Sequence, residues 1–98
     1  SWNYRENTIP TNNRGYMKAF VIYDSKAGFY RPPMVYKSTG EALREFADAV
    51  NNPETFVAKH PADYTLFEMG EYNELQGVLT MHEAKTSLGV ATEYIKAQ

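Results

Sequence analysis

The sequence predicts an α+β domain in which an antiparallel sheet of four to five strands packs against one amphipathic helix. Three observations support this fold class: an aromatic-rich hairpin pattern over residues 16–37, a capped helical pattern over residues 38–52, and a second hairpin pattern over residues 65–81. Runs of antiparallel strands with one packed helix are typical of α+β folds. The chain has 98 residues, enough for one domain, which we assign to residues 16–98.

The first hairpin begins with Tyr16–Tyr23, in which both alternating sets of side chains are largely apolar. A strand that is apolar on both faces is expected in the middle of a sheet. Asp24–Gly28 has the composition of a turn, and Phe29–Lys37 returns as a second strand. Because Pro32 and Pro33 lack an N–H group, this second strand is expected at an edge or at a bulge.

A helix is predicted directly after this hairpin. Ser38 and Glu41 have the spacing of a capping box, in which the Ser38 hydroxyl reaches the amide of residue 41 and Glu41 reaches back to the amide of residue 38. Asn51–Pro53 ends the helix. One face carries the apolar residues that we expect in the core: Leu43, Phe46, Ala47 and Val50.

The second hairpin consists of Thr65–Tyr72, a turn at Asn73–Gly77 and a return strand at Val78–Met81. Gly70 interrupts the first of these strands and predicts a bulge. The final stretch, Leu88–Ala97, fits a helix and a strand equally well. Both hairpins together supply the strands of the predicted sheet.

Residues 1–15 are polar and show no periodicity. We interpret them as an irregular N-terminal arm or an added extension. The aromatic residues of this segment either pin the arm to the core or to a partner chain, or belong to a disordered tail. The globular domain is therefore expected to start at residue 16.

Charge and aromatic content are distributed unevenly along the chain. Residues 1–37 carry six Lys or Arg against two acidic residues, whereas residues 38–98 carry four against ten. Eight of the fourteen aromatic residues also lie in the first 37 positions. Cations that hold phosphates and rings that stack on bases are what single-stranded nucleic acid requires. The alternative is that the rings form the core and the charges belong to an ordinary surface.

We therefore predict a nucleic-acid interface on the first hairpin. In this interpretation its rings and cations share one groove that faces the solvent. The candidate residues are Tyr16, Lys18, Lys26, Phe29, Arg31, Tyr36 and Lys37.

Other classes of function find little support in the sequence. There is no cysteine, and His60 and His82 lack the spacing of metal ligands, so neither a metal nor another cofactor is expected. Phosphate-binding glycine motifs and nucleophile elbows are absent, and Ser38 is explained as a helix cap. No apolar run approaches the ~20 residues of a membrane span. We expect a non-enzymatic, soluble protein.

Four segments resemble the small nonstructural protein of gokushovirus-type Microviridae, the small phages with single-stranded DNA genomes. The similarity covers residues 17–97, and members of that family usually begin near the position of Met17. The matching segments are IYD-KA at Ile22–Ala27, GEALR-F-DAVN at Gly40–Asn51, KHP-DYTLF--GE at Lys59–Glu71 and LGVATEYIK at Leu88–Lys96.

This resemblance implies a bacteriophage protein that is made in the host bacterial cytoplasm and is absent from the mature capsid. It also implies DNA binding, with a part in viral replication or packaging of the single-stranded genome. The family offers no catalytic motif, so no active-site residue is carried over.

Two further expectations concern partners. The Pro-bearing edge strand and the aromatic arm offer a surface through which the chain could form a homodimer. The acidic second half favours an alternative function, a protein-interaction module that acts on a host replication or defence protein.

Overall fold

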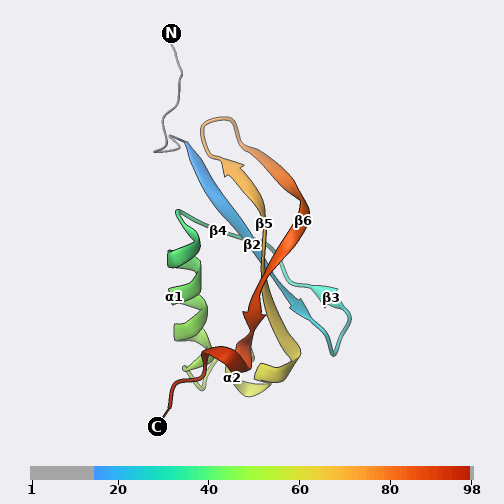
Figure 1. Ribbon diagram of the computed structural model, residues 1–98, viewed down its shortest axis with the longest axis vertical. Coiled ribbons are helices and arrows are strands. Elements are labelled where there is room, and N and C mark those ends of the chain that lie inside the picture. Colours follow the sequence, from blue (N-terminus) through green and yellow to red (C-terminus); the bar gives the residue numbers. More distant parts are fainter. Residues whose placement is uncertain (1–14, 98) are drawn as a thin grey trace.

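The computed structural model describes residues 15–97, which form one antiparallel sheet with helices on one of its faces (Figure 1). The sheet has five strands in the order β3-β2-β5-β6, and β4 also pairs with β2. The predicted α+β fold is confirmed. The strands are β2 (Tyr16–Asp24), β3 (Phe29–Tyr30), β4 (Met34–Tyr36), β5 (Tyr64–Asn73) and β6 (Val78–Val90). The helices are α1 (Thr39–Val50), α2 (Phe56–Lys59) and the 3-10 turns η1 (Pro61–Asp63) and η2 (Ala91–Tyr94).

Strand β2 lies in the interior of the sheet, as its apolar pattern predicts. It pairs with β5 along its whole length, while β3 and β4 share its other side. Pro32 and Pro33 separate these two short strands, so the expected edge position of the Pro-bearing segment is confirmed. The N–H group of Arg31 bridges the gap by donating to the carbonyl of Ile22 at 2.8 Å.

Helix α1 begins at the predicted cap. The Ser38 hydroxyl accepts a hydrogen bond from the amide of Glu41 at 3.1 Å. The Glu41 carboxylate accepts from the amide of Lys37 at 2.8 Å, so the expected return bond to residue 38 is wrong by one position. The backbone of Ser38 is extended (φ −151°, ψ 163°), and the Glu41 carboxylate bonds the amide of the residue before Ser38. The first bond satisfies an N–H group that the start of a helix leaves free, and the second ties the residue before the cap to the helix.

The core lies between α1 and the near face of the sheet. Ala42, Phe46 and Val50 are buried against Phe20 and Leu66. Leu43 and Ala47, which the sequence analysis placed in the core, are only partly buried at the flank of this face. The helix is thus turned slightly from the predicted orientation.

Strand β6 is much longer than the predicted Val78–Met81, because it continues to Val90 before the 3-10 turn η2. Glu68 pairs with Thr86 and Gly70 pairs with Met81, so the four residues 82–85 lie opposite Met69 alone. The predicted bulge is therefore present, with Met69 rather than Gly70 as the unpaired residue of β5. Its effect is to bend β6 beside β5.

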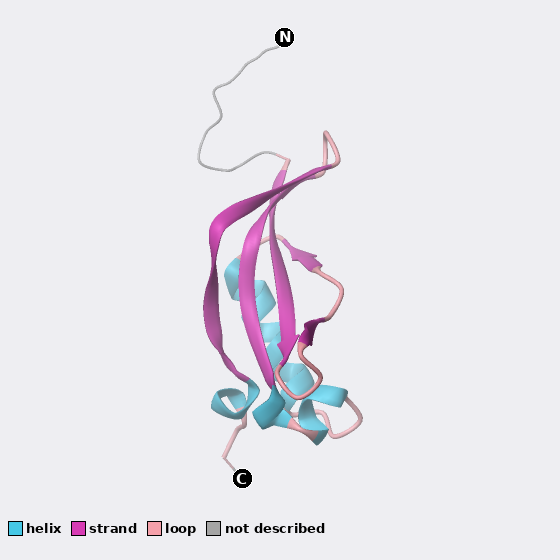
Figure 2. Ribbon diagram, turned by 90° about the vertical axis from the view of Figure 1, so that its right-hand side faces the viewer, coloured by secondary structure: helices cyan, strands magenta, loops and turns pink. Residues whose placement is uncertain are grey.

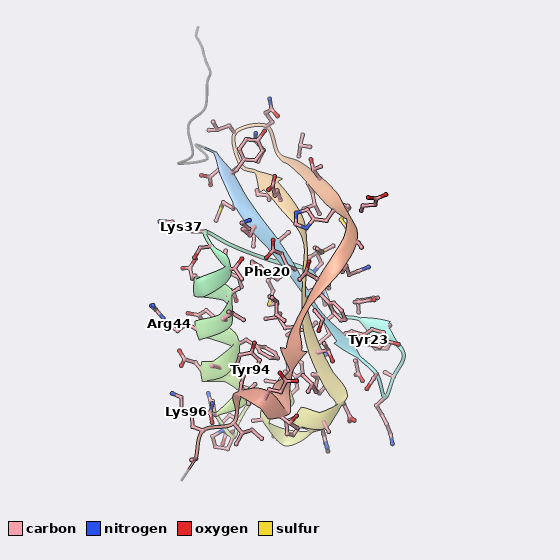
Figure 3. The ribbon with its side chains drawn as sticks, in the orientation of Figure 1. Phe20, Tyr23, Lys37, Arg44, Tyr94 and Lys96 are labelled. Carbon is pink, nitrogen blue, oxygen red and sulfur yellow. The ribbon has the colours of Figure 1, made fainter. Side chains whose placement is uncertain are left out.

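The C-terminal segment folds back onto α1. The Asn51 side chain donates to the carbonyl of Tyr94 and accepts from the amide of Lys96, each at 2.9 Å. The ring of Tyr94 lies edge-on to Phe46 with a centroid distance of 5.3 Å, and Figure 3 shows it between α1 and the end of β6. These contacts close one end of the core. Of the arm predicted over residues 1–15, all but Gly15 lies outside the described residues.

Candidate nucleic-acid interface

The two faces of the sheet differ in what covers them. Phe20 and Leu66 point toward α1, whereas their strand neighbours Val21 and Phe67 point to the opposite face. Within residues 15–97 no helix packs on that opposite face, and Figure 2 shows the long strands in front of α1 when seen from this side. We call it the uncovered face because no helix lies on it, although Val21 on this face is itself only 3% exposed.

Three rings and one cation gather on the uncovered face near the β2–β3 turn. The ring centroids of Tyr23 and Tyr30 lie 4.7 Å apart, and those of Tyr30 and Phe67 lie 6.2 Å apart. The Nζ atom of Lys85 lies 4.9 Å from the centroid of the Tyr30 ring. We call these four residues the aromatic patch.

Four different strands build the aromatic patch. The β2–β3 register places Tyr23 directly opposite Tyr30, and the β2–β5 register brings Phe67 beside β2. Lys85 comes from the segment of β6 that bulges opposite Met69. Tyr30 stays 46% exposed, so its ring remains available to a flat ligand. Partly exposed rings beside a cation can stack on bases and hold a phosphate.

Three of the seven predicted site residues lie around this end of the sheet. Lys26 is in the turn that the Asp24 carboxylate holds by accepting from the amides of Lys26 and Ala27, each at 3.0 Å. Phe29 is 57% exposed in β3. The guanidinium carbon of Arg31 lies 3.8 Å above the ring of Phe56, which places Arg31 beside α2 on the covered side of this end of the sheet.

The other four predicted residues lie toward the opposite end of β2. Lys18 pairs with Tyr36 across the strands, Tyr16 begins β2, and Lys37 stands before α1 (Figure 3). At ~3.3 Å per residue, the six steps from Lys18 to Asp24 span roughly 20 Å. The structure therefore does not bring the seven residues into one groove but divides them into two groups.

Lys18 and Tyr36 are also engaged on the covered face. The Nζ atom of Lys18 lies 3.7 Å from a carboxylate oxygen of Glu68, which in turn accepts a hydrogen bond from Thr39 at 2.9 Å. The Tyr36 ring packs on Phe20 with a centroid distance of 5.9 Å. Burial raises the pKa of the Tyr36 hydroxyl, and the nearby carboxylates of Glu45 and Glu41 raise it further.

This raised pKa of Tyr36 predicts a loss of stability in alkaline solution. The folded state favours the neutral hydroxyl, so its contribution is complete below the ordinary pKa of 10.0 and is lost as the pH rises through the higher folded value. The free energy of unfolding should therefore fall less steeply in Tyr36→Phe than in the wild type above that pH. Urea unfolding at a series of alkaline pH values measures this slope, and equal slopes would contradict the prediction.

None of the four members of the aromatic patch was among the predicted site residues. Pairing outward from the predicted turn Asp24–Gly28 would set Tyr23 opposite Phe29. In the structure Asp24 already pairs with Phe29, so Tyr23 lies opposite Tyr30. No local signal identifies Phe67, which reaches the patch through the β2–β5 register, or Lys85, which reaches it through the bulged β5–β6 pairing.

The described part of the chain does not build a metal site around either histidine. His60 precedes η1 and His82 lies in β6. Among residues 15–97 no group of three or more His, Asp or Glu side chains is arranged to hold a metal ion. None of the helices formed by these residues is long and apolar enough to cross a membrane.

The fold and the aromatic patch define an α+β protein with one covered and one aromatic sheet face. Residues 17–94 match the family described as Phage ORF5 protein, so the chain belongs to this family of phage proteins. No curated protein and no solved structure matches the chain significantly.

Proposed function

We propose that this phage protein is a non-enzymatic binder of single-stranded DNA, and that the aromatic patch is its DNA-contacting surface. The observation that carries the proposal is the arrangement of Tyr23, Phe67 and Lys85 around Tyr30 on a sheet face without a helix. The DNA would be bound during genome replication or packaging in the host bacterial cytoplasm.

The energetics favour stacking over bulk electrostatics. A base stacked on an aromatic side chain contributes ~1–3 kcal/mol whatever its identity. Lys26 in the β2–β3 turn and Lys85 beside Tyr30 are the cations nearest in the fold to the patch, and we expect them to meet the phosphates on either side of stacked bases. With about two phosphates neutralised, the logarithm of the binding constant should fall with the logarithm of salt concentration with a slope of roughly −1.4. Binding is thus expected to be moderately sensitive to salt.

Acidic residues elsewhere on the protein would direct the single-stranded DNA to the end of the sheet that carries the aromatic patch. Glu71 and Glu74 lie at the far end of the long hairpin, and Glu68 occupies the covered face. Since Glu68 and Glu71 pair with Phe20 and Lys18, DNA that moved to the covered side of β5 would meet like charge. The resemblance to the nonstructural protein of gokushovirus-type Microviridae supports the same ligand, because such phages produce single-stranded genomes.

Fluorescence anisotropy with a labelled thymidine oligonucleotide tests the proposal. Removing the Tyr30 ring should weaken binding about tenfold, since one stack is lost and each ~1.4 kcal/mol is a factor of ten. The matched control is Tyr16→Ala, because Tyr16 is 45% exposed, against 46% for Tyr30, but lies at the other end of β2. Tyr16→Ala should change the affinity by less than about twofold.

The contribution of positive charge to DNA binding is tested with a second variant and its control. Lys85→Glu should weaken binding and reduce the salt slope by about one, whereas Lys37→Glu, at an exposed position before α1, should leave the slope unchanged. Two results would reject the aromatic patch as the DNA site: no binding at low salt, or equal losses in the patch variants and their controls.

A further inference from the structure

An apolar cavity opens on the covered side of the sheet. It has a volume of about 200 Å³ and lies between α1, α2, β4 and the strands beneath them. Three aromatic rings contribute to its wall: Tyr36 from β4, Phe46 from α1 and Phe56 from α2. Ala49 and Val57 line it with short side chains, which is why the space stays open.

The size of the cavity suits one aromatic side chain. An engineered apolar cavity of about 150 Å³ in another protein takes up benzene, so a somewhat larger one can take a single or fused ring. Burying such a ring among apolar walls is favourable because it removes apolar surface from water. The cavity is also open to the solvent at one side, where Phe56 is 37% exposed, so a side chain can enter without unfolding the core.

The polar groups of the wall indicate what should accompany that ring. Glu45 lines the cavity, and no cation within residues 15–97 forms an ion pair with it. The Tyr36 hydroxyl contacts only the sulfur of Met34, at 3.9 Å, among the described side chains. The raised pKa of Tyr36 has the Glu45 and Glu41 charges among its causes, which indicates an acidic rim near this hydroxyl. The opposite wall has its own cation, because Arg31 stacks on Phe56.

We infer that this cavity is a docking site for a partner polypeptide that inserts one aromatic side chain and places an adjoining Lys or Arg beside Glu45. The complementary charge favours a polypeptide over a nucleic acid, because the carboxylates of the rim would repel phosphates. The cavity lies on the covered side and the aromatic patch on the uncovered face, so a protein and a DNA strand could be held at the same time. Docking of a polypeptide in the cavity goes beyond the proposed DNA binding and does not depend on it.

Two short peptides and a matched pair of variants test the inference by NMR. The probes are blocked tripeptides, Lys-Trp-Lys and Glu-Trp-Glu, added at millimolar concentration to the isotope-labelled protein. We expect Lys-Trp-Lys to shift the amide signals of Ala49 and Val57 and to bind at least about fivefold more tightly than Glu-Trp-Glu. Ala49→Leu fills the cavity and should weaken binding at least about fivefold, whereas Ala47→Leu, on the same helix but outside the cavity wall, should not.

Glu45 is exposed, so a second variant can replace it without disturbing the fold. Glu45→Lys should reverse the preference, so that Glu-Trp-Glu binds more tightly than Lys-Trp-Lys. The inference is overturned if neither peptide shifts the cavity signals, if Ala49→Leu and Ala47→Leu behave alike, or if Glu45→Lys leaves the preference unchanged. Oligonucleotide binding by Ala49→Leu should equal that of the wild type, so failure here is distinguishable from failure of DNA binding.

Discussion

Replacing Gly70 with alanine is expected to destabilise the protein by about 3 kcal/mol, the upper end of what overpacking usually costs. A Cβ atom at this position would lie 2.2 Å from the carbonyl oxygen of Thr80 and 3.0 Å from the Cα atom of Met81. Both atoms belong to the backbone of β6, which cannot rotate aside as a side chain can. The long β5–β6 hairpin would have to open next to its bulge.

Urea unfolding measures this effect, and Gly40→Ala is the matched control. Gly40 lies in the first turn of α1, and a Cβ atom there would meet only the Ser38 hydroxyl at 3.8 Å. Alanine is the better helix former by ~1 kcal/mol, so this control should be neutral or stabilising. Equal unfolding free energies for the two variants would contradict the close approach of β5 and β6 at Gly70.

Replacing Phe20 with alanine should cost about 3–5 kcal/mol, the range for removing a buried phenylalanine side chain. Phe20 is fully buried at the centre of the core, where it contacts Tyr36 and faces α1 (Figure 3). Its removal leaves a cavity between helix and sheet that neither element can close. Because domains of this kind are stable by only ~5–15 kcal/mol, the variant should be close to unfolding.

The same substitution at Phe29 provides the control for Phe20→Ala. Phe29 is 57% exposed in β3, so Phe29→Ala should change the free energy of unfolding by only about 0.5 kcal/mol. Thermal or urea unfolding compares the two directly. If Phe20→Ala lowered the free energy of unfolding as little as Phe29→Ala, the Phe20 ring would not lie in the core.

The local features of the fold could be predicted because each depends on a short stretch of sequence. The cap at Ser38, the edge position of Pro32 and Pro33, and the turn at Asn73–Gly77 all follow from the chemistry of the residues concerned. The full length of β6 could not be predicted in this way. Residues 82–85 of β6 have no one-to-one partners in β5, because all four lie opposite Met69.

The candidate site was harder to predict, for a physical reason. Both faces of β2 are apolar, so the sequence does not indicate which face α1 covers. α1 packs on Phe20 and Ile22, which leaves Lys18 and Tyr36 on the covered side and Tyr23 on the uncovered one. The predicted residues Lys18 and Tyr36 therefore point away from the aromatic patch, and Tyr23, which was not predicted, belongs to it.

The last two members of the aromatic patch depend on long-range pairing. Phe67 reaches Tyr30 through the β2–β5 register, and Lys85 reaches it through the bulge of β6. A shift of one residue in either pairing would turn these side chains to the other face. A surface assembled from four strands therefore leaves no contiguous motif in the sequence.

The most direct measurement is an NMR titration of the isotope-labelled protein with a thymidine oligonucleotide. If the aromatic patch binds single-stranded DNA, the largest changes in amide chemical shift should fall on Tyr23, Tyr30, Phe67 and Lys85 and should diminish as salt is added. Changes centred on Tyr16 and Lys37 at the other end of β2, or no changes at low salt, would contradict it.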